Sequence, residues 1–400
     1  MHILVDQALP FASEAFSPFG DVTVLPGAEI SAATVHDADA LFVRSGVRVN
    51  AALLESSRVR FVGTATAGTD HIDVDYLRQH NITFAEAAGS NAESVADWFV
   101  AALLELAARH NLDYDGMKLG IVGVGHVGSA VMRRTAGFFD EFITHDPPLG
   151  DDAGDTLFDC DVITIHTPLT DAGPYPTRNM LDAEWLAQMK PGCILINAAR
   201  GGIVDEAALI DALDSGHIRA CAIDVWTGEP HINAELLRRA DIATPHIAGH
   251  SYDGKVACTQ LMHNALANFL GVSPNWNSTA VLAELESSPI VVNQIEIAPD
   301  DYRVDLYNIM RNVVAQVYDI RNDDAAFRDI LSLPGAARPD HFRQLRRNYP
   351  RRREFSGTPV QFSPEWLNTE MGRSVAKTFA MYLTGIGFTR ISAGAEVWHP

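Results

Sequence analysis

The sequence predicts an α/β protein with two doubly wound, parallel-sheet domains and a smaller α+β domain at its C-terminal end. Short apolar or β-branched runs, typical of buried parallel strands, alternate with polar, Gly-containing or helical stretches through residue 257. A glycine loop at residues 123–128 follows one of these runs and opens a helical segment. At 400 residues the chain is longer than one hydrophobic core usually supports, so several domains are expected.

Changes in this pattern place the domain boundaries. The helical stretch after residue 256 can cross back to the first domain, which predicts a discontinuous domain of residues 1–90 and 258–276. The alternation restarts at residue 118 after a long apolar helix, so residues 91–257 form a second domain. Residues 277–400 then form a separate α+β domain.

The individual elements follow from hydrophobic period and from helix and turn signals. Strands are expected at residues 2–5, 39–43, 61–66, 119–122, 141–146, 161–168, 192–199, 220–226, 241–248, 289–297 and 387–393. Helices are expected at residues 91–110, 257–271, 302–318 and 366–384.

Charge and cysteine content exclude several classes of protein. The net charge of -21 and the pI near 5.0 argue against nucleic acid as a main partner, because phosphate would be repelled. The four cysteines are widely spaced and form no CxxC pair, so we expect small buried residues and no metal site or disulfide framework. No apolar run is long enough to span a membrane and no signal-peptide pattern is present, which predicts a cytoplasmic protein without a membrane partner.

The glycine loop has the pattern of a dinucleotide-binding turn. Gly123, Gly125 and Gly128 follow an apolar strand, and glycine permits the tight turn and the close approach of a pyrophosphate to a helix N-terminus. Asp146 ends the next strand, at about the spacing of the acid that binds ribose hydroxyls. Its charge would repel a 2'-phosphate, so the pattern favours NAD over NADP; the alternative role of Asp146 is a turn cap in HDPP.

Three residues of different chemistry follow later strands of the same domain. Arg200 in NAARGGIVDE offers a cation for a carboxylate, His246 in TPHIAGH a base, and Glu229 in DVWTGEP an acid that orients this base. Each alone could be structural, as an ion-pair residue, a loop carboxylate or a buried imidazole. Because all three follow strands at the carboxyl edge of one sheet, where ligands bind in such folds, together they predict hydride transfer at a 2-hydroxy acid.

The motifs resemble the D-2-hydroxyacid dehydrogenase superfamily. The similarity lies in VRSG, GTATAGTDHID, GIVGVGHVG, NAARGGIVD, DVWTGEP and HIAGH. GTATAGTDHID, the Asp-Pro-Pro after residue 145 and the GPY insertion in HTPLTDAGPYPT are similar to one branch, which acts on a phosphorylated hydroxy acid. LPG, RRNYPRRREF and the helix-strand ending resemble the dimerisation domain of that branch, so the resemblance covers essentially the whole chain.

The resemblance implies two Rossmann-like domains, one for substrate and one for NAD, and a homodimer formed through the C-terminal domain. It implies that Arg200 grips the substrate, that His246 takes the hydroxyl proton and that Glu229 holds His246 in orientation. Cofactor contacts are expected at Gly123, Gly125, His126, Val127, Gly128, Asp146, His166, Thr167, Pro168, Ala199, Asp224 and Gly249. Substrate contacts are expected at Arg44, Ser45, Thr66 and His250, with Arg48 as either a second cation or a surface residue.

Two features leave alternatives open. Members of the branch commonly have tyrosine where this chain has His250, so substrate contact there is in doubt and a titratable side chain would make binding pH-dependent. The basic segment is a solvated surface, a dimer contact or, least favoured, a nucleic-acid site; it contains Arg343, Arg346, Arg347, Arg351, Arg352 and Arg353.

Two other functions share the catalytic trio. One is another enzyme of the superfamily, of the phosphoglycerate or glyoxylate/hydroxypyruvate type, and the other is an NAD-sensing corepressor on the same fold. The GPY block and the C-terminal domain count against the first, and no peptide-docking feature supports the second.

Overall fold

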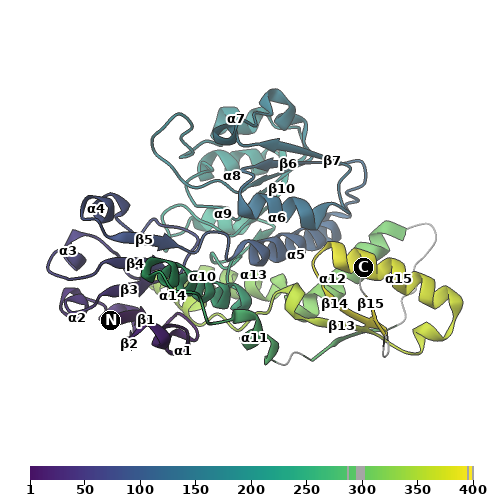
Figure 1. The fold of residues 1–400 in the computed structure, drawn as a ribbon. Coiled ribbons are helices and arrows are strands. Elements are labelled where there is room, and N and C mark those ends of the chain that lie inside the picture. Colours follow the sequence, from purple (N-terminus) through teal and green to yellow (C-terminus); the bar gives the residue numbers. More distant parts are fainter. Residues whose placement is uncertain (286–287, 294–301, 394–395, 399–400) are drawn as a thin grey trace. The chain divides into compact units, whose positions relative to one another are not determined.

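The structure is a computed structural model that describes residues 1–285, 288–293, 302–393 and 396–398. The chain divides into two compact units (Figure 1). Unit 1 comprises residues 1–92 and 251–286, and unit 2 comprises residues 93–250 and 287–400. Part of the strand predicted at residues 289–297 lies outside the described residues.

Unit 1 is a five-stranded parallel sheet in the order β2-β1-β3-β4-β5. Its strands are β1 (His2–Asp6), β2 (Asp21–Leu25), β3 (Ala40–Val43), β4 (Phe61–Thr64) and β5 (Thr83–Glu86). Its helices are α1 (Ala12–Phe16), α2 (Ala32–Val35), α3 (Ala51–Leu54), α4 (Val74–Gln79), α10 (Tyr252–Leu270) and α11 (Ser278–Ala283), with 3-10 turns η1 (Ser17–Phe19) and η2 (Gly27–Glu29).

Both faces of this sheet are buried, as a doubly wound fold requires. Along β1, Ile3 and Val5 pack into one core with residues of α1 and α10, and Leu4 packs into a second core with residues of α2, α3 and α4. This alternation follows the two-residue period of a strand. Because α10 returns to the sheet after unit 2, Val256 and Met262 complete the first core.

Unit 2 contains a six-stranded parallel sheet in the order β11-β10-β9-β8-β6-β7. The strands are β6 (Lys118–Val122), β7 (Glu141–His145), β8 (Val162–Ile165), β9 (Cys193–Asn197), β10 (Ile218–Ile223) and β11 (Ile242–Ala243). The helices are α5 (Ala92–His110), α6 (His126–Thr135), α7 (Ala183–Gln188), α8 (Glu206–Asp214) and α9 (Ala234–Arg239), with η3 (Pro147–Leu149) and η4 (Gly154–Asp159). The two parallel sheets confirm the predicted fold class.

The order of winding reverses between β6 and β8. The chain first adds β7 on one side of β6 and then crosses to β8 on the other side. Ligands of such sheets bind at this reversal, outside the carboxyl ends of the strands. The glycine loop follows β6 and His166 follows β8, so both lie at the reversal.

The C-terminal part of unit 2 adds a four-stranded sheet in the order β12-β13-β14-β15, in which only β15 is antiparallel. Its strands are β12 (Ile290–Val292), β13 (Pro359–Phe362), β14 (Arg390–Ala393) and β15 (Glu396–Trp398). Its helices are α12 (Tyr302–Val317), α13 (Ile320–Arg328), α14 (Arg338–Arg347) and α15 (Glu370–Gly385), with η5 (Asp329–Ser332), η6 (Gly335–Ala337), η7 (Phe355–Gly357) and η8 (Trp366–Asn368).

The predicted helix at residues 366–384 is wrong at its start. A 3-10 turn ends at Asn368, and α15 begins at Glu370. Thr369 is extended and its hydroxyl accepts the amide of Gly372 at 2.9 Å, so it caps the helix. A Cβ at Gly372 would lie 1.9 Å from the carbonyl oxygen of Trp366. Glycine at this position therefore lets the helix approach the preceding turn closely.

Helix α13 covers the open edge of the six-stranded sheet. The amide of Ala243 in the edge strand β11 donates to the Asp324 carboxylate at 2.8 Å. Asp324 also binds Arg328, which donates to the carbonyls of Leu237 and Ala240 at 2.7 and 2.6 Å. An unpaired strand edge is a template for association, so this helix both satisfies and shields it.

Aromatic side chains also attach α13 and α14 to the core of unit 2. The rings of Trp226 and Phe327 lie 5.3 Å apart, and Phe327 is 5.8 Å from Phe342 of α14. Phe327 and Phe342 are buried in the same hydrophobic cluster as the strands of the sheet. Residues of α13 and α14 are therefore part of the core of unit 2.

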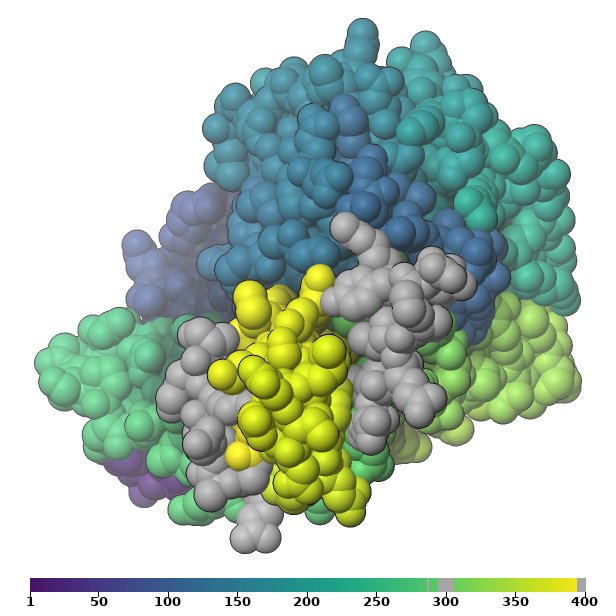
Figure 2. All heavy atoms as spheres, turned by 90° about the vertical axis from the view of Figure 1, so that its right-hand side faces the viewer, coloured from purple at the N-terminus to yellow at the C-terminus, as the bar shows by residue number. Residues whose placement is uncertain are grey.

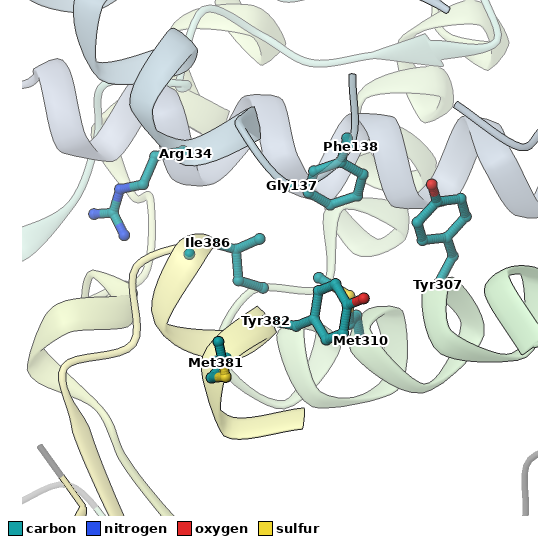
Figure 3. A pocket seen from close by; sticks show the side chains of 9 residues that line it. Arg134, Gly137, Phe138, Tyr307, Met310, Met381, Tyr382 and Ile386 are labelled. Carbon is teal, nitrogen blue, oxygen red and sulfur yellow. The ribbon is translucent and has the colours of Figure 1, made fainter. Parts of the chain in front are cut away.

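A small apolar cavity of about 70 Å³ separates the end of α6 from α12 and α15. Figure 3 shows Phe138, Tyr307, Met310 and Tyr382 around it. Phe138 stacks on Tyr307 with ring centroids 5.5 Å apart. The cavity is far smaller than a typical ligand site of about 300 Å³ or more, so we interpret it as a packing seam.

Two expectations from composition concern burial and membranes. All four cysteines are buried, and burial raises the pKa of the Cys160 thiol to about 12. Within the described ranges, no helix has both the length and the apolar character that crossing a membrane requires.

Replacing Asp324 tests the edge attachment. Asp324→Ala should lower the free energy of unfolding by about 2–4 kcal/mol, because it leaves the buried Ala243 amide without its acceptor and Arg328 without its carboxylate. Urea unfolding measures the change. Asp329→Ala removes the same charge from an exposed neighbour and should change stability by less than about 0.5 kcal/mol. Equal midpoints for the two variants would contradict this role of Asp324.

Candidate active site

The glycine loop of unit 2 has the close contacts that a dinucleotide turn needs. Gly123 has φ +90°, and a Cβ there would lie 2.9 Å from the backbone of His166. A Cβ at Gly128 would lie 2.1 Å from the carbonyl oxygen of Gly123. Larger residues are therefore excluded at Gly123 and Gly128. Gly125 faces open space and directly precedes His126, the first residue of α6. The loop therefore presents a helix N-terminus to a ligand.

Asp146 lies at the end of β7 and touches this loop. Its Oδ2 accepts the amide of Val124 at 2.7 Å, which ties the end of β7 to the turn. This contact takes one carboxylate oxygen. The arrangement fits a carboxylate that holds the turn and binds ribose hydroxyls with its second oxygen.

His166 and Thr167 lie across from the glycine loop at the end of β8. His166 Nε2 pairs with the Thr164 hydroxyl at 3.0 Å. Burial lowers the pKa of His166 to about 3, so the ring is neutral. Within the described residues, His166 Nδ1 and Thr167 Oγ1 are buried without a hydrogen-bond partner. Buried polar atoms of this kind are normally satisfied, so they fit a polar ligand such as the nicotinamide nucleotide.

Arg200 lies on the loop after β9. Asn197 holds this loop by accepting the amide of Ala199 at 3.1 Å and donating to the carbonyl of Arg200 at 3.3 Å. A Cβ at Gly201 would lie 2.0 Å from the carbonyl oxygen of Trp226. Glycine thus lets the Arg200 loop approach the loop after β10, which carries Glu229.

Glu229 and His246 are in direct contact. His246 Nδ1 lies 2.8 Å from Glu229 Oε2, and the other oxygen of Glu229 accepts the amide of Trp226 at 2.8 Å. Burial alone would raise the pKa of the Glu229 carboxyl, but His246 and these hydrogen bonds hold it below its usual value. Glu229 is therefore ionised and fixes the proton on Nδ1, which leaves Nε2 as the atom that can exchange a proton with substrate.

Asp224 is buried at the end of β10 and binds the loop that carries His246. Its Oδ1 accepts the Thr244 hydroxyl at 2.6 Å and the Ile247 amide at 2.8 Å, and its Oδ2 accepts the Ala248 amide at 2.9 Å. Burial raises the pKa of Asp224, and His246 and the three donors oppose this rise. These contacts give Asp224 a positioning role; its contact with NAD stays a prediction.

Glu206 is a site residue that sequence reasoning missed. It opens α8, and its Oε1 accepts the amide of Thr227 at 2.7 Å, so it supports the loop that carries Glu229. Burial raises the pKa of the Glu206 carboxyl. The only signal in the sequence is its place at the end of NAARGGIVDE, six residues after Arg200.

Unit 1 holds three of the four predicted substrate residues, at the carboxyl ends of two paired strands, whereas His250 lies in unit 2. Arg44 and Ser45 follow β3, and Thr66 follows β4; Val43 pairs with Thr64. Thr64 Oγ1 bonds to Thr66 at 2.8 Å and to His71 Nε2 at 2.9 Å. Burial, together with Arg44, lowers the pKa of His71, although Asp70 opposes this.

Arg44 has an unused donor. Its Nη1 is buried and has no hydrogen-bond partner among the described residues. A cation with a free donor beside threonine and serine hydroxyls is suited to an oxyanion. Arg48 is exposed, which favours the surface role for that residue.

The basic segment is not uniformly solvated. Arg352 is 5% exposed and donates to the carbonyls of Ser94 and Ala248 within the same chain. The solvated-surface interpretation is therefore wrong for Arg352, although Arg343, Arg347 and Arg351 are exposed. His250, at the end of the His246 loop, is half-buried, and its ring lies 5.9 Å from that of Tyr349.

Two family models match the chain. Residues 96–248 match the NAD-binding domain of D-isomer-specific 2-hydroxyacid dehydrogenases. Residues 292–373 match a domain of unknown function, DUF3410. The first match covers the glycine loop together with Arg200, Glu229 and His246, and it confirms NAD as the cofactor of this domain.

Solved structures are similar to about two thirds of the chain. A protein from Thermus thermophilus is 29% identical, with a TM-score of 0.57, over 68% of this chain and 98% of that one. The NAD complex of an NAD-dependent formate dehydrogenase from Staphylococcus aureus is 25% identical, with a TM-score of 0.57, over 70% of this chain and 98% of that one. NAD-dependent dehydrogenases thus share the fold.

Curated relatives match nearly the whole chain. Erythronate-4-phosphate dehydrogenase from Cronobacter sakazakii is 42% identical over 91% of this chain and 95% of the relative. The enzyme of the same name from Azotobacter vinelandii is 42% identical over 91% of this chain and 96% of the relative. The chain therefore belongs to the erythronate-4-phosphate dehydrogenases, within the D-2-hydroxyacid dehydrogenase family.

Proposed function

We propose that the protein oxidises 4-phospho-D-erythronate to (R)-3-hydroxy-2-oxo-4-phosphobutanoate with NAD, a step towards pyridoxal 5'-phosphate in the cytoplasm. The observation that carries the proposal is the contact between His246 and Glu229, 2.8 Å long, in a chain that otherwise matches enzymes of this name. A neutral imidazole whose Nδ1 proton is held by a carboxylate is a base at Nε2.

The chain's residues handle charge and protons. NAD, when bound at the glycine loop, would supply the acceptor for the hydride from C2. His246 Nε2 takes the hydroxyl proton, so the C–O bond becomes a carbonyl, and the Glu229 carboxylate stabilises the imidazolium that forms. Arg200 supplies the cation for the substrate carboxylate.

Unit 1 supplies groups suited to the substrate's phosphate. We assign this role to Arg44 and Ser45, with Thr66 nearby on the paired strand. The unused Nη1 of Arg44 supports the assignment, because a phosphate oxygen would satisfy it.

The substrate is tested by following NAD reduction with four acids. 4-Phosphoerythronate should be oxidised in preference to 3-phosphoglycerate, lactate and glycerate. Preference for 3-phosphoglycerate, or no turnover of any acid, would overturn the assignment.

His246→Gln should lower kcat by about 10²–10⁴-fold while the Kd for NAD changes little, because the residue moves a proton and does not hold the dinucleotide.

Replacing Glu229 should move the pH profile. Because Glu229 is ionised, it favours the imidazolium, and oxidation needs neutral His246. Glu229→Gln should therefore shift the acid limb of kcat/KM to lower pH, while kcat falls as the ring loses its orientation. Glu235→Gln removes an exposed charge from α9 and should leave the limb in place. A limb that moves to higher pH, or not at all, contradicts this role of Glu229.

Asp146 should set the choice between NAD and NADP. Asp146→Asn should raise the KM for NAD about tenfold or more and reduce the preference over NADP, because a charged acceptor for ribose hydroxyls is lost. Initial rates with both cofactors measure this. Asp155→Asn, at an exposed position, is the matched control. An unchanged ratio of kcat/KM for the two cofactors would exclude the role.

We propose further that residues 277–400 form a dimerisation domain, and that the face of its sheet opposite α12 and α15 is the interface. In Figure 1, α12 and α15 lie on one side of the four-stranded sheet. The strand residues that are buried are Ile290, Val292, Val360, Phe362, Ile391 and Ala393. Between them, Val291, Gln361 and Ser392 are in register and point to the other face, and Val291 is 48% exposed. This face therefore combines one exposed apolar residue, Val291, with the polar side chains of Gln361 and Ser392, and we place the partner surface there.

Light scattering after chromatography tests the interface. Val291→Glu should convert a dimer to monomers by burying a charge. A second candidate surface is α15, shown in yellow on the face seen in Figure 2, where Met371 and Met381 are 74% and 70% exposed. Met381→Glu should leave the dimer intact. Dissociation by Met381→Glu alone would move the interface to α15, and a monomeric wild-type protein would exclude both.

A further inference from the structure

The loop that carries His246 has a strained backbone. His246 has φ +57°, in the left-handed region that is unfavourable for a residue with a side chain. Such a conformation persists where the surroundings fix it from several directions. Asp224 supplies one direction, because its carboxylate accepts the amides of Ile247 and Ala248.

Two arginines of the C-terminal part hold the opposite side of this loop. Arg346 Nε donates to the carbonyl oxygen of His246 at 3.3 Å. Arg352 Nη2 donates to the carbonyl oxygen of Ala248 at 2.5 Å. The peptide unit between residues 246 and 247 is thus held at both ends, its carbonyl by Arg346 and its amide by Asp224.

Arg352 is itself firmly placed. It is 5% exposed, and its guanidinium carbon lies 4.2 Å from the centre of the Tyr318 ring. Its Nη2 also donates to the carbonyl of Ser94 at 3.3 Å, and the Ser94 hydroxyl donates to Glu354 at 2.8 Å. A buried cation is costly unless it has several partners, and here these partners include the catalytic loop.

Arg346 lies on α14, which is anchored to the same sheet. Its guanidinium carbon lies 5.9 Å from the ring of Phe342, which packs against Phe327 of α13. Arg346 is also among the charges that lower the pKa of Glu229. The charged groups that face the Glu229 and His246 pair therefore include Arg346 from α14 and Asp224 from the end of β10.

We propose that Arg346 and Arg352 are positioning residues for His246, so that the C-terminal part of the chain completes the catalytic loop of its own protomer. The domain of unknown function then contributes to catalysis as well as to any assembly. The kinetic half of the proposal rests on the proposed function. Its structural half concerns the loop alone and is measured without substrate.

The kinetic test compares neighbouring arginines. Arg346→Ala should lower kcat about 10- to 100-fold, the scale of a small misplacement of a catalytic group, with the KM for 4-phosphoerythronate and the Kd for NAD changed less than about threefold. Arg346→Lys should recover part of kcat. Arg347→Ala removes the same charge from an exposed position of α14 and should match wild type.

The structural test is hydrogen exchange of the loop in the full chain. The amides of Ile247 and Ala248 should exchange faster in Arg346→Ala and in Arg352→Lys than in wild type or Arg347→Ala. Arg346 is only half-buried, so its variant is expected to fold even if an Arg352 variant does not. Exchange at the wild-type rate in Arg346→Ala overturns the proposal whatever happens to kcat.

Two further outcomes are decisive. A loss of activity that appears mainly in the KM for 4-phosphoerythronate would make Arg346 a substrate contact and overturn its positioning role. A wild-type chain that does not oxidise 4-phosphoerythronate would overturn the proposed function, while the exchange rates would still decide whether the arginines hold the loop.

Discussion

The buried carboxylate of Asp224 is the constraint on which the arrangement of the active-site loops depends. It is 1% exposed and accepts three hydrogen bonds, two of them from amides of the His246 loop. Removing such an acceptor would leave those amides unsatisfied in the interior, which costs roughly 1–3 kcal/mol each. With the loop so fixed, His246 Nδ1 meets Glu229, and the orientation of the imidazole follows from that contact. The chemistry therefore depends on a carboxylate that need not touch substrate.

Close backbone approach is the second requirement, and glycine meets it at three places. Gly123 and Gly128 allow the cofactor turn to fold against β8 and against itself. Gly201 allows the Arg200 loop to lie against Trp226, whose amide in turn binds Glu229. The same parallel sheet sets these loops side by side, because β9 and β10 pair in register at Asn197 and Ile223. Cofactor turn, cation and acid–base pair are thus placed by strand order together with a few glycines.

Sequence reasoning identified the features for which the chemistry allows only a few residue types. The two parallel sheets, the glycine loop and the pairing of residue types at strand ends all depend on local patterns, and the structure contains them. The strands β2 and β5 were not predicted, because their residues are mostly exposed or half-buried and give no apolar run. Strand β13 was also missed, although its four residues alternate between half-buried and buried. The burial of Arg352 was also missed, since nothing within RRNYPRRREF distinguishes an arginine that meets distant carbonyls from one in solvent. A local sequence pattern predicts the chemistry of a residue well, but it does not identify hydrogen-bond partners that lie far along the chain.

The short edge strand explains why the His246 loop needs partners from so far along the chain. Strand β11 has only two residues, Ile242 and Ala243, so the sheet itself gives the following loop little support. Short edge strands resist unwanted pairing, yet they anchor poorly what comes after them. Here Asp324 satisfies the amide of Ala243, and Arg328 ties α13 to the preceding helix end. The same attachment brings Arg346 and Arg352 to the carbonyls of the loop. Covering a sheet edge and holding His246 are therefore parts of one packing arrangement, because the segment that shields β11 also fixes the residues directly after it.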